Sequence, residues 1–237
     1  MAELTEADKT DDAARWWRAY RLAENDQVDE LRGLARAGDD HASRQLAGWL
    51  SDRAFRGGVS DSAKLREAIE VIRPLADNGD DDAELWLTRW LGDCDRIEEL
   101  RERAGVGSDR ASRELARLLA DHDLLDELRD RVSATGDHYA LRELARRLIE
   151  NDMDTDLREL LETADADTRQ QILDTAAGAS SEWINAVRVL ADFGHKASRR
   201  CLARTLASQG RLDELRQRAE QGDEYAQHWL ANTLADP

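Results

Sequence analysis

The chain repeats one pattern of apolar and polar positions along almost its whole length. A small residue is followed at four-residue intervals by two larger apolar residues, as in Ala42, Leu46 and Leu50. This spacing places the three side chains on one face of an α-helix. A shorter segment before each such helix has apolar residues at intervals of three and four. The pattern therefore predicts alternating shorter and longer amphipathic helices.

An anchor residue separates the shorter helix from the longer one in each copy. The anchors are Thr10, Gly38, Gly79, Gly107, Gly136, Ala164, Gly194 and Gly222, at spacings of 28, 41, 28, 29, 28, 30 and 28 residues. Asp follows the anchor in six copies, from Asp11 to Asp223, and Ser108 follows it in a seventh. Gly closes a helix at positive φ, and Asp or Ser caps the next helix. Each anchor thus predicts a tight turn between two helices.

Helices that bury one stripe are stable only when they are stacked. We therefore expect an all-α fold, an α-solenoid of about eight helix-turn-helix repeats and about fifteen helices in a right-handed superhelix. Residues 1–9 are expected to form an acidic tail, and residues 10–237 a single repeat domain. An insertion at 52–64 lengthens two helices around a loop. The segment 174–182 is either a soft joint or the product of ordinary drift in one copy.

Two stretches carry a more specific pattern. One is Ser198, Leu202, Ala203, Leu206, Gly210, Leu212, Leu215 and Ala219; the other runs from Ala42 through Gly57, Gly58, Val59, Asp61 and Lys64 to Ala83. The first resembles the tetratricopeptide repeat superfamily and the second its Sel-type branch. The period here is shorter than in that family, and the family's terminal Pro is absent. The resemblance implies that the longer helices line a concave side, where related grooves hold extended peptides.

Composition narrows the choice of partners. There are 34 Lys plus Arg against 51 Asp plus Glu, so the net charge is −17 and binding to nucleic acid or to an anionic membrane is disfavoured. No apolar run is long enough to span a bilayer, and the acidic N-terminus does not resemble a secretory signal. Two cysteines, Cys94 and Cys201, fit a reducing compartment, and we expect a cytoplasmic protein.

Catalytic and metal-binding patterns are weak. The five His lie at different places in the repeat, and no nucleotide-binding or zinc motif is present. Asp152, Asp154 and Asp156 alternate as in a calcium loop, but Leu157 stands where that loop requires Gly. We therefore predict no enzyme activity, no cofactor and no metal.

Arg is placed regularly in both kinds of helix. In the shorter helices it follows the central apolar residue in seven copies: Arg32, Arg73, Arg101, Arg129, Arg158, Arg188 and Arg216. We expect each to reach the capping Asp of a neighbouring repeat, which would form a ladder of ion pairs; a ligand role is the alternative. In the longer helices, positions six and ten past the anchor hold eight Arg and one acid among sixteen residues, which reverses the overall charge bias.

These Arg residues define the candidate binding face. The candidate residues are Arg44, Arg89, Arg113, Arg117, Arg142, Arg146, Arg200, Arg204, Tyr139 and Tyr225. Guanidinium groups bind carboxylates through paired hydrogen bonds, so we predict a non-catalytic scaffold that binds an acidic peptide or protein segment in a concave groove. Alternatively, the face is merely solvated, with its Arg paired to nearby acids such as Glu114 and Glu143.

Two further alternatives concern the partner. An acidic inhibitor or immunity-type protein could mask a basic partner with its convex surface. The last helix keeps Trp229, Leu230 and Leu234 at an apolar end, which predicts self-association there or continuation into a longer array. In the first helix Arg18 replaces the usual Leu and is expected to form a polar cap.

Overall fold

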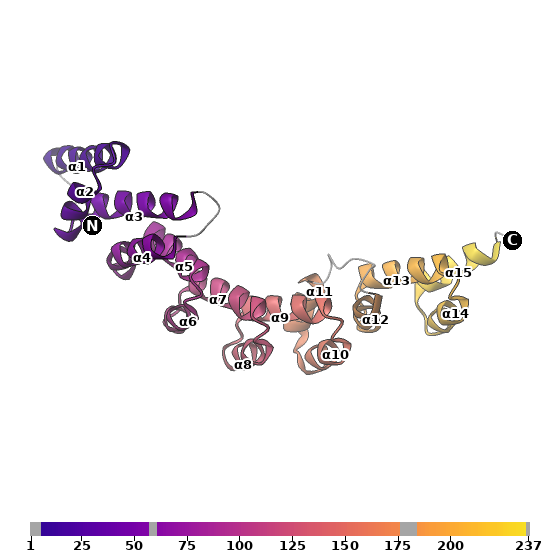
Figure 1. The fold of residues 1–237 in the computed structure, drawn as a ribbon. Coiled ribbons are helices and arrows are strands. Elements are labelled where there is room, and N and C mark those ends of the chain that lie inside the picture. Colours follow the sequence, from indigo (N-terminus) through magenta and orange to yellow (C-terminus); the bar gives the residue numbers. More distant parts are fainter. Residues whose placement is uncertain (1–5, 57–60, 176–183, 236–237) are drawn as a thin grey trace. The chain divides into compact units, whose positions relative to one another are not determined.

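The protein is all-α in the computed structural model, which describes residues 6–56, 61–175 and 184–235. Within these ranges there are fifteen helices and no strand (Figure 1). They are α1 (Glu6–Glu24), α2 (Val28–Arg36), α3 (Asp40–Phe55), α4 (Ser62–Asp77), α5 (Asp81–Asp93), α6 (Ile97–Gly105), α7 (Asp109–Asp121), α8 (Leu125–Thr135), α9 (His138–Glu150), α10 (Asp154–Thr163), α11 (Ala166–Thr175), α12 (Ile184–Asp192), α13 (Lys196–Ser208), α14 (Leu212–Glu220) and α15 (Glu224–Ala235). The predicted all-α class and the predicted number of about fifteen helices are confirmed for these residues.

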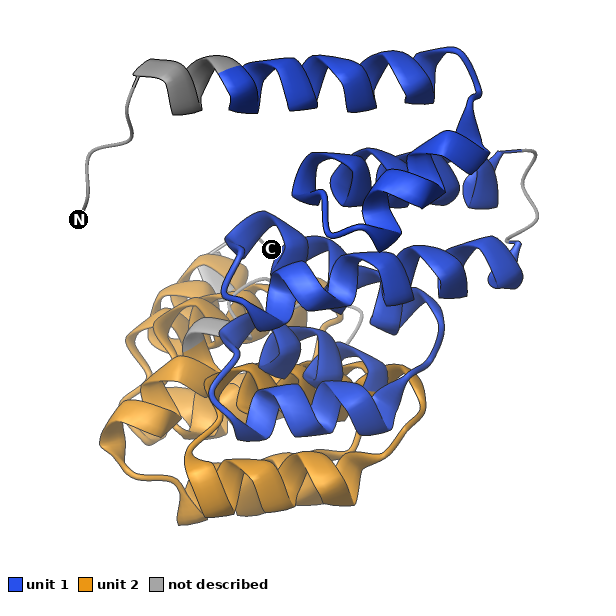
Figure 2. Cartoon of the chain, turned by 90° about the vertical axis from the view of Figure 1, so that its left-hand side faces the viewer, with its two compact units in different colours: residues 1–118 blue, residues 119–237 orange. Residues whose placement is uncertain are grey.

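The helices fall into two compact units, residues 1–118 and 119–237 (Figure 2). In unit 1 each helix from α2 to α5 packs against the next one along the chain, and α1 packs on α2 and α3. In unit 2 the pairs α8–α9, α12–α13 and α14–α15 pack together, and so do helices two apart, such as α9 with α11 and α13 with α15. Stacked helix pairs make contacts of this kind. The solenoid arrangement and its right-handed superhelix stay predictions.

The predicted stripe of the longer helices forms the core. In α3, α5, α7, α9 and α13 all three stripe residues are buried. They are Ala42, Leu46 and Leu50, Ala83, Leu87 and Leu91, Ala111, Leu115 and Leu119, Ala140, Leu144 and Leu148, and Ser198, Leu202 and Leu206. The central Leu of most shorter helices is also fully buried, as Leu100, Leu128 and Leu215 show. Each helix therefore buries one face against its neighbours.

The turns at the anchors are confirmed wherever the anchor is Gly. All six anchor glycines have φ between 66° and 96°, a conformation that residues with a Cβ avoid. The following Asp or Ser then caps the longer helix: Asp39 Oδ1 accepts from the amide of Ala42 at 2.9 Å, and Asp80 Oδ1 accepts from that of Ala83 at 2.8 Å. Ala164, without this freedom, has φ −69° and an extended turn.

The first copy departs from the prediction. The turn expected at Thr10 and Asp11 does not form, because α1 runs without interruption from Glu6 to Glu24. Position 10 is Thr, whereas the anchors that reverse the chain at positive φ are Gly. The residues from Glu6 to Lys9, which were assigned to a tail, instead belong to this helix, where acidic residues in the first turn are favoured by the helix dipole. Arg18 is exposed, as expected of a polar cap, and donates to Glu30 at 2.8 Å.

The other irregular segments fit the sequence in part. Around the insertion, α3 and α4 are both lengthened to 16 residues, as predicted; residues 57–60 between them are not described. In the degenerate copy Asp154 takes an apolar position at the start of α10, where desolvation and the nearby Asp152 raise its pKa. The candidate soft joint at 174–182 lies almost entirely outside the described residues.

The ladder of Arg residues forms, but with a different partner from the one expected. Arg73 donates to Glu99 at 2.6 Å, Arg129 to Asp156 at 2.8 Å and Arg188 to Glu214 at 2.9 Å. Arg32 binds both carboxylate oxygens of Glu67, at 2.7 and 3.0 Å. The prediction that these Arg reach a capping Asp is wrong. The acid within reach lies on the next shorter helix, and in the first three pairs it stands two residues before that helix's own ladder Arg.

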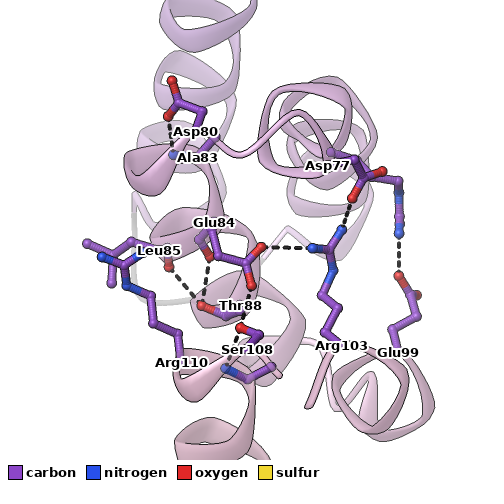
Figure 3. Close-up of polar contacts among 12 residues, drawn as sticks. Asp77, Asp80, Ala83, Glu84, Leu85, Thr88, Glu99, Arg103, Ser108 and Arg110 are labelled. Carbon is purple, nitrogen blue, oxygen red and sulfur yellow. Dashed lines mark hydrogen bonds and ion pairs between the residues drawn. The ribbon is translucent and has the colours of Figure 1, made fainter. Parts of the chain in front are cut away.

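A second Arg reaches back along the chain. Arg103 pairs with Asp77 at the end of α4 and donates to Glu84 of α5 at 2.7 Å (Figure 3). Glu84 also accepts from the hydroxyl of Ser108 at 2.6 Å, so one half-buried carboxylate connects α5, α6 and the start of α7. In unit 2 Arg218 likewise reaches back to Asp192 at the end of α12, at 2.7 Å. Charges thus link successive helices in both directions.

A second regular turn was not foreseen. It joins a longer helix to the next shorter one, and a residue with positive φ occupies it in five copies: Asp26, Asp95, Asp123, Asp152 and Gly210. Among residues with a side chain, Asp and Asn tolerate this left-handed conformation best, yet they still adopt it at a cost. The Asp at this position therefore does in these turns what Gly does at the anchors.

These turns predict an order of stability at Asp152. Replacing Asp152 by Gly relieves its backbone at φ 52°, whereas replacing it by Ala retains a Cβ in the left-handed region. Both variants remove the same charge, so their difference isolates the backbone. We expect the Gly variant to exceed the Ala variant by about 1 kcal/mol in free energy of unfolding, measured by urea denaturation. Gly210→Ala should cost a similar amount; equal stabilities of the two Asp152 variants would contradict the explanation.

Candidate functional site

The ten predicted binding residues separate into groups within the two units. Arg44, Arg89, Arg113 and Arg117 belong to unit 1, on α3, α5 and α7. The remaining six are in unit 2, on α9, α13 and α15: Tyr139, Arg142, Arg146, Arg200, Arg204 and Tyr225. Each is exposed or half-buried, as expected of residues opposite the buried stripe. Six of the ten line two surface hollows: Arg89, Arg113 and Arg117 line one in unit 1, and Arg200, Arg204 and Tyr225 line one in unit 2.

The unit 1 hollow has mixed charge. It encloses about 390 Å³ between α5 and α7 and is lined by Leu85, Thr88, Arg89, Asp93, Arg110, Arg113, Glu114 and Arg117. Glu114 accepts from Arg117 at 2.5 Å, as the alternative interpretation of a self-paired face expects. Desolvation raises the pKa of Asp93, and the nearby Glu114 adds to this shift. Four cations and two acids thus share this site, which weakens its attraction for a further anion.

A glycine makes room for the acid in this hollow. A Cβ at Gly92 of α5 would lie 2.0 Å from Oε1 of Glu114 and 2.8 Å from its Cγ. The side chain of Glu114 therefore lies directly over the α5 backbone. Any side chain at position 92 would displace this carboxylate and the ion pair that it forms with Arg117.

Two other predicted residues are neutralised by neighbouring acids. Arg44 pairs with Asp80, the capping residue of α5. Arg146 donates to Glu143 at 2.8 Å and to Glu150 at 2.7 Å on its own helix. Tyr139 lies with its ring 3.9 Å from that of His138. These residues form local ion pairs and ring contacts, so the candidate face is only partly available to a ligand.

The unit 2 hollow is larger and differs in charge. It encloses about 900 Å³ and lies over α11, α13 and α15. Its described lining is Gln170, Leu173, Gly194, His195, Lys196, Ala197, Arg200, Cys201, Arg204, Tyr225 and Trp229, and we call it the cationic hollow. It contains Arg200, Arg204 and Tyr225 from the predicted set. The sequence did not identify the contribution of α11, nor the part played by His195 and Lys196.

No carboxylate belongs to the described lining of the cationic hollow. Lys196, Arg200 and Arg204 are exposed, and none of them forms an ion pair with another described residue. The turn before α13 contributes to this imbalance, because His195 stands where five of the other longer helices have a capping Asp. His195 at an Asp position, beside one of the three Lys of the chain, is the signal in the sequence that could have located the site.

Aromatic side chains replace charged ones along one edge of the cationic hollow. Tyr225 and Trp229 stand three and seven residues past their anchor on α15. Arg110 and Glu114 hold the same two positions on α7, where they line the unit 1 hollow. The repeat therefore presents the same edge in two forms, one charged and one aromatic.

A possible catalytic pair in this region is structural. Nδ1 of His195 lies 2.6 Å from the hydroxyl of Ser198. Ser198 is only 5% exposed and is part of the buried stripe, so its oxygen cannot reach a substrate. Both residues lie at the start of α13, so the contact is local to one helix. Over the ranges that the structure describes, no group of His, Cys, Asp or Glu could hold a metal ion.

The expected apolar end of the last helix is partly covered. Trp229 and Leu230 are half-buried and pack against a core cluster that includes Leu202, Leu206 and Leu215. The side chain of Leu234 lies outside the described residues. Self-association through α15 stays a prediction, and the placement of Trp229 in the cationic hollow offers a different use for that residue.

No protein-family model, curated protein or solved structure matches the chain significantly. The resemblance to the tetratricopeptide and Sel-type repeats therefore stays a prediction from the sequence. Among the helices described here, none has the length and apolar character needed to cross a bilayer.

The pair formed by Arg44 and Asp80 predicts a pH effect. The cap hydrogen bond from Ala83, and then Arg44, hold the pKa of Asp80 below its ordinary value of 3.8. A lowered pKa in the folded state stabilises the protein above pH 3.8, and this contribution is lost as the pH falls through the lowered pKa. Asp80→Asn keeps a capping side chain but removes the charge. We expect it to lower the free energy of unfolding by about 1 kcal/mol or less at pH 7.

The control for this prediction is the same measurement in acid. The difference between Asp80→Asn and the wild type should shrink in urea titrations taken progressively below pH 3.8. A gap that stays constant down to the lowest pH would show that the charge of Asp80 contributes nothing.

Proposed function

We propose that the chain is a non-catalytic interaction scaffold that binds an acidic peptide or protein segment, and that the cationic hollow of unit 2 is its principal binding site. One observation carries this proposal. In a chain of net charge −17, a hollow of about 900 Å³ is lined by three cations and by no described carboxylate. Such a site attracts anions against the overall charge of the molecule.

The identity of the cations favours carboxylates as the ligand. Arg200 and Arg204 are four residues apart on α13, so they lie on one face, one turn apart. A guanidinium group presents paired donors that match the two oxygens of a carboxylate, and Lys196 adds a third charge. The neutralised Arg44, Arg117 and Arg146 are not needed for this function. Tetratricopeptide-like stacking of the helix pairs is part of the same proposal.

A second candidate function follows from the exposed acidic residues of the shorter helices. The first turns of the shorter helices carry acids that are almost fully exposed, such as Asp29, Asp126 and Asp213. Each lies beside the ladder Arg of its own helix and still presents its carboxylate to solvent. This row supports the alternative of an acidic inhibitor that masks a basic partner, and it would use residues distinct from the cationic hollow.

Charge reversal in the hollow tests the proposed function. Arg200→Glu and Arg204→Glu should each weaken binding of a fluorescent acidic peptide by about tenfold or more, because each replaces attraction by repulsion. Fluorescence anisotropy measures the dissociation constant, and circular dichroism checks that the helices are intact. Binding should also weaken as salt is added.

Arg216→Glu provides the matched control. It makes the same charge change on α14 of the same unit, where the side chain is exposed and pairs with Asp213. We expect it to leave peptide affinity within about twofold of the wild type. If all three variants bind equally well, the hollow is not the binding site. Loss of binding to a basic protein in Asp126→Arg would instead support the second candidate.

A further inference from the structure

We infer that the acidic segment recognised by the cationic hollow alternates acidic and bulky apolar residues in an extended conformation. This inference rests on the proposed function and narrows it from any acidic segment to one pattern. Carboxylates would bind along α13, and the apolar side chain between them would pack against α15.

The spacing of the cations sets the first part of the pattern. Arg200 and Arg204 are separated by four residues of helix, or about 6 Å along its axis. In an extended peptide, side chains two residues apart point to the same side and repeat every ~6.6 Å. Two acids separated by one residue therefore match the two Arg. A continuous run of acids would direct every second carboxylate away from them.

The aromatic side chains of α15 determine which residue we expect between the two acids. Tyr225 and Trp229 are also four residues apart, on α15, which packs against α13. Both are half-buried, and Leu173 of α11 adds a further apolar side chain to the lining. A peptide lying along the boundary between these two packed helices would turn alternate side chains toward one helix and then the other. The side chain facing α15 meets aromatic rings and is stabilised there by burial of apolar surface.

The described lining of the unit 1 hollow lacks this aromatic wall. There, Arg110 and Glu114 take the places of Tyr225 and Trp229, and Glu114 occupies Arg117. The volume of the cationic hollow, about 900 Å³, lies at the upper end of the range of ligand pockets, ~300 to 1,000 Å³. It is large enough for a short stretch of peptide rather than a single ion.

Cys201 permits a test at the site itself. It lines the cationic hollow, whereas Cys94 lies in unit 1, so the two thiols serve as reporter and internal control. The wild-type protein is treated with N-ethylmaleimide, and the alkylation rate of each cysteine is followed by peptide mass spectrometry. Three peptides of equal length are compared: one alternating Glu and Phe, one alternating Glu and Ser, and one alternating Gln and Phe.

The inference and the proposed function predict distinct outcomes. The Glu–Phe peptide should slow alkylation of Cys201 by about tenfold at saturation and leave Cys94 unchanged. It should bind at least about tenfold more tightly than the Glu–Ser peptide, the effect expected from burying one large apolar side chain. The Gln–Phe peptide should not protect Cys201. Equal affinity for the two Glu peptides would overturn the inference and leave the proposed function standing; no protection by either would overturn both.

A variant of the aromatic wall provides the complementary test. Trp229→Ala should abolish the preference for Glu–Phe over Glu–Ser while binding of the Glu–Ser peptide is retained. Trp17→Ala, which removes an exposed Trp from α1 in unit 1, is the matched control and should keep the full preference. The ratio of the two affinities is read within each variant, so a modest loss of stability does not obscure the result. A preference that survives Trp229→Ala would contradict the assignment of α15.

Discussion

Most helices of this protein are too short to be stable alone, and the rest of the structure is organised around that constraint. Four of the shorter helices, α2, α6, α12 and α14, have nine residues each, below the ~12 to 15 at which isolated helices become even marginally stable. Each therefore depends on apolar contact with its neighbours. The small residue at the start of the stripe, usually Ala, lets the next helix approach closely, and glycine turns with capped helix starts fix where each helix begins.

Arg has two separate roles in this arrangement. In the shorter helices Arg pairs with an acid on the next shorter helix, as Arg73 does with Glu99. These charges are neutralised within the fold. On the longer helices some Arg, such as Arg117, pair instead with an acid on their own helix. Arg200 and Arg204 are not matched by any described acid. Three residues before Arg204 stands Cys201, at the position where Glu114 pairs with Arg117 and Glu143 pairs with Arg146.

Much of the fold follows from the sequence because the repeat is local. The stripe from Ala42 to Leu50 and the anchors such as Gly38 depend on helical spacing and on positive φ, which act within one or two helices. Thr10 was misread because the pattern was extended to a copy without its glycine. The partners of the ladder Arg were missed because the reach of a side chain from one helix to another cannot be read from spacing along either helix. The left-handed turn at Asp152 was missed because an Asp that recurs at a turn does not by itself indicate positive φ. The Arg of the cationic hollow were identified by position, but their freedom from acids could be seen only in three dimensions.

The ladder has a direction. In the pairs of Arg73 with Glu99, Arg129 with Asp156 and Arg188 with Glu214, the Arg lies on the earlier shorter helix and the acid on the later one. Each of these pairs therefore couples two shorter helices in a fixed order, with the guanidinium on the earlier helix and the carboxylate on the later one.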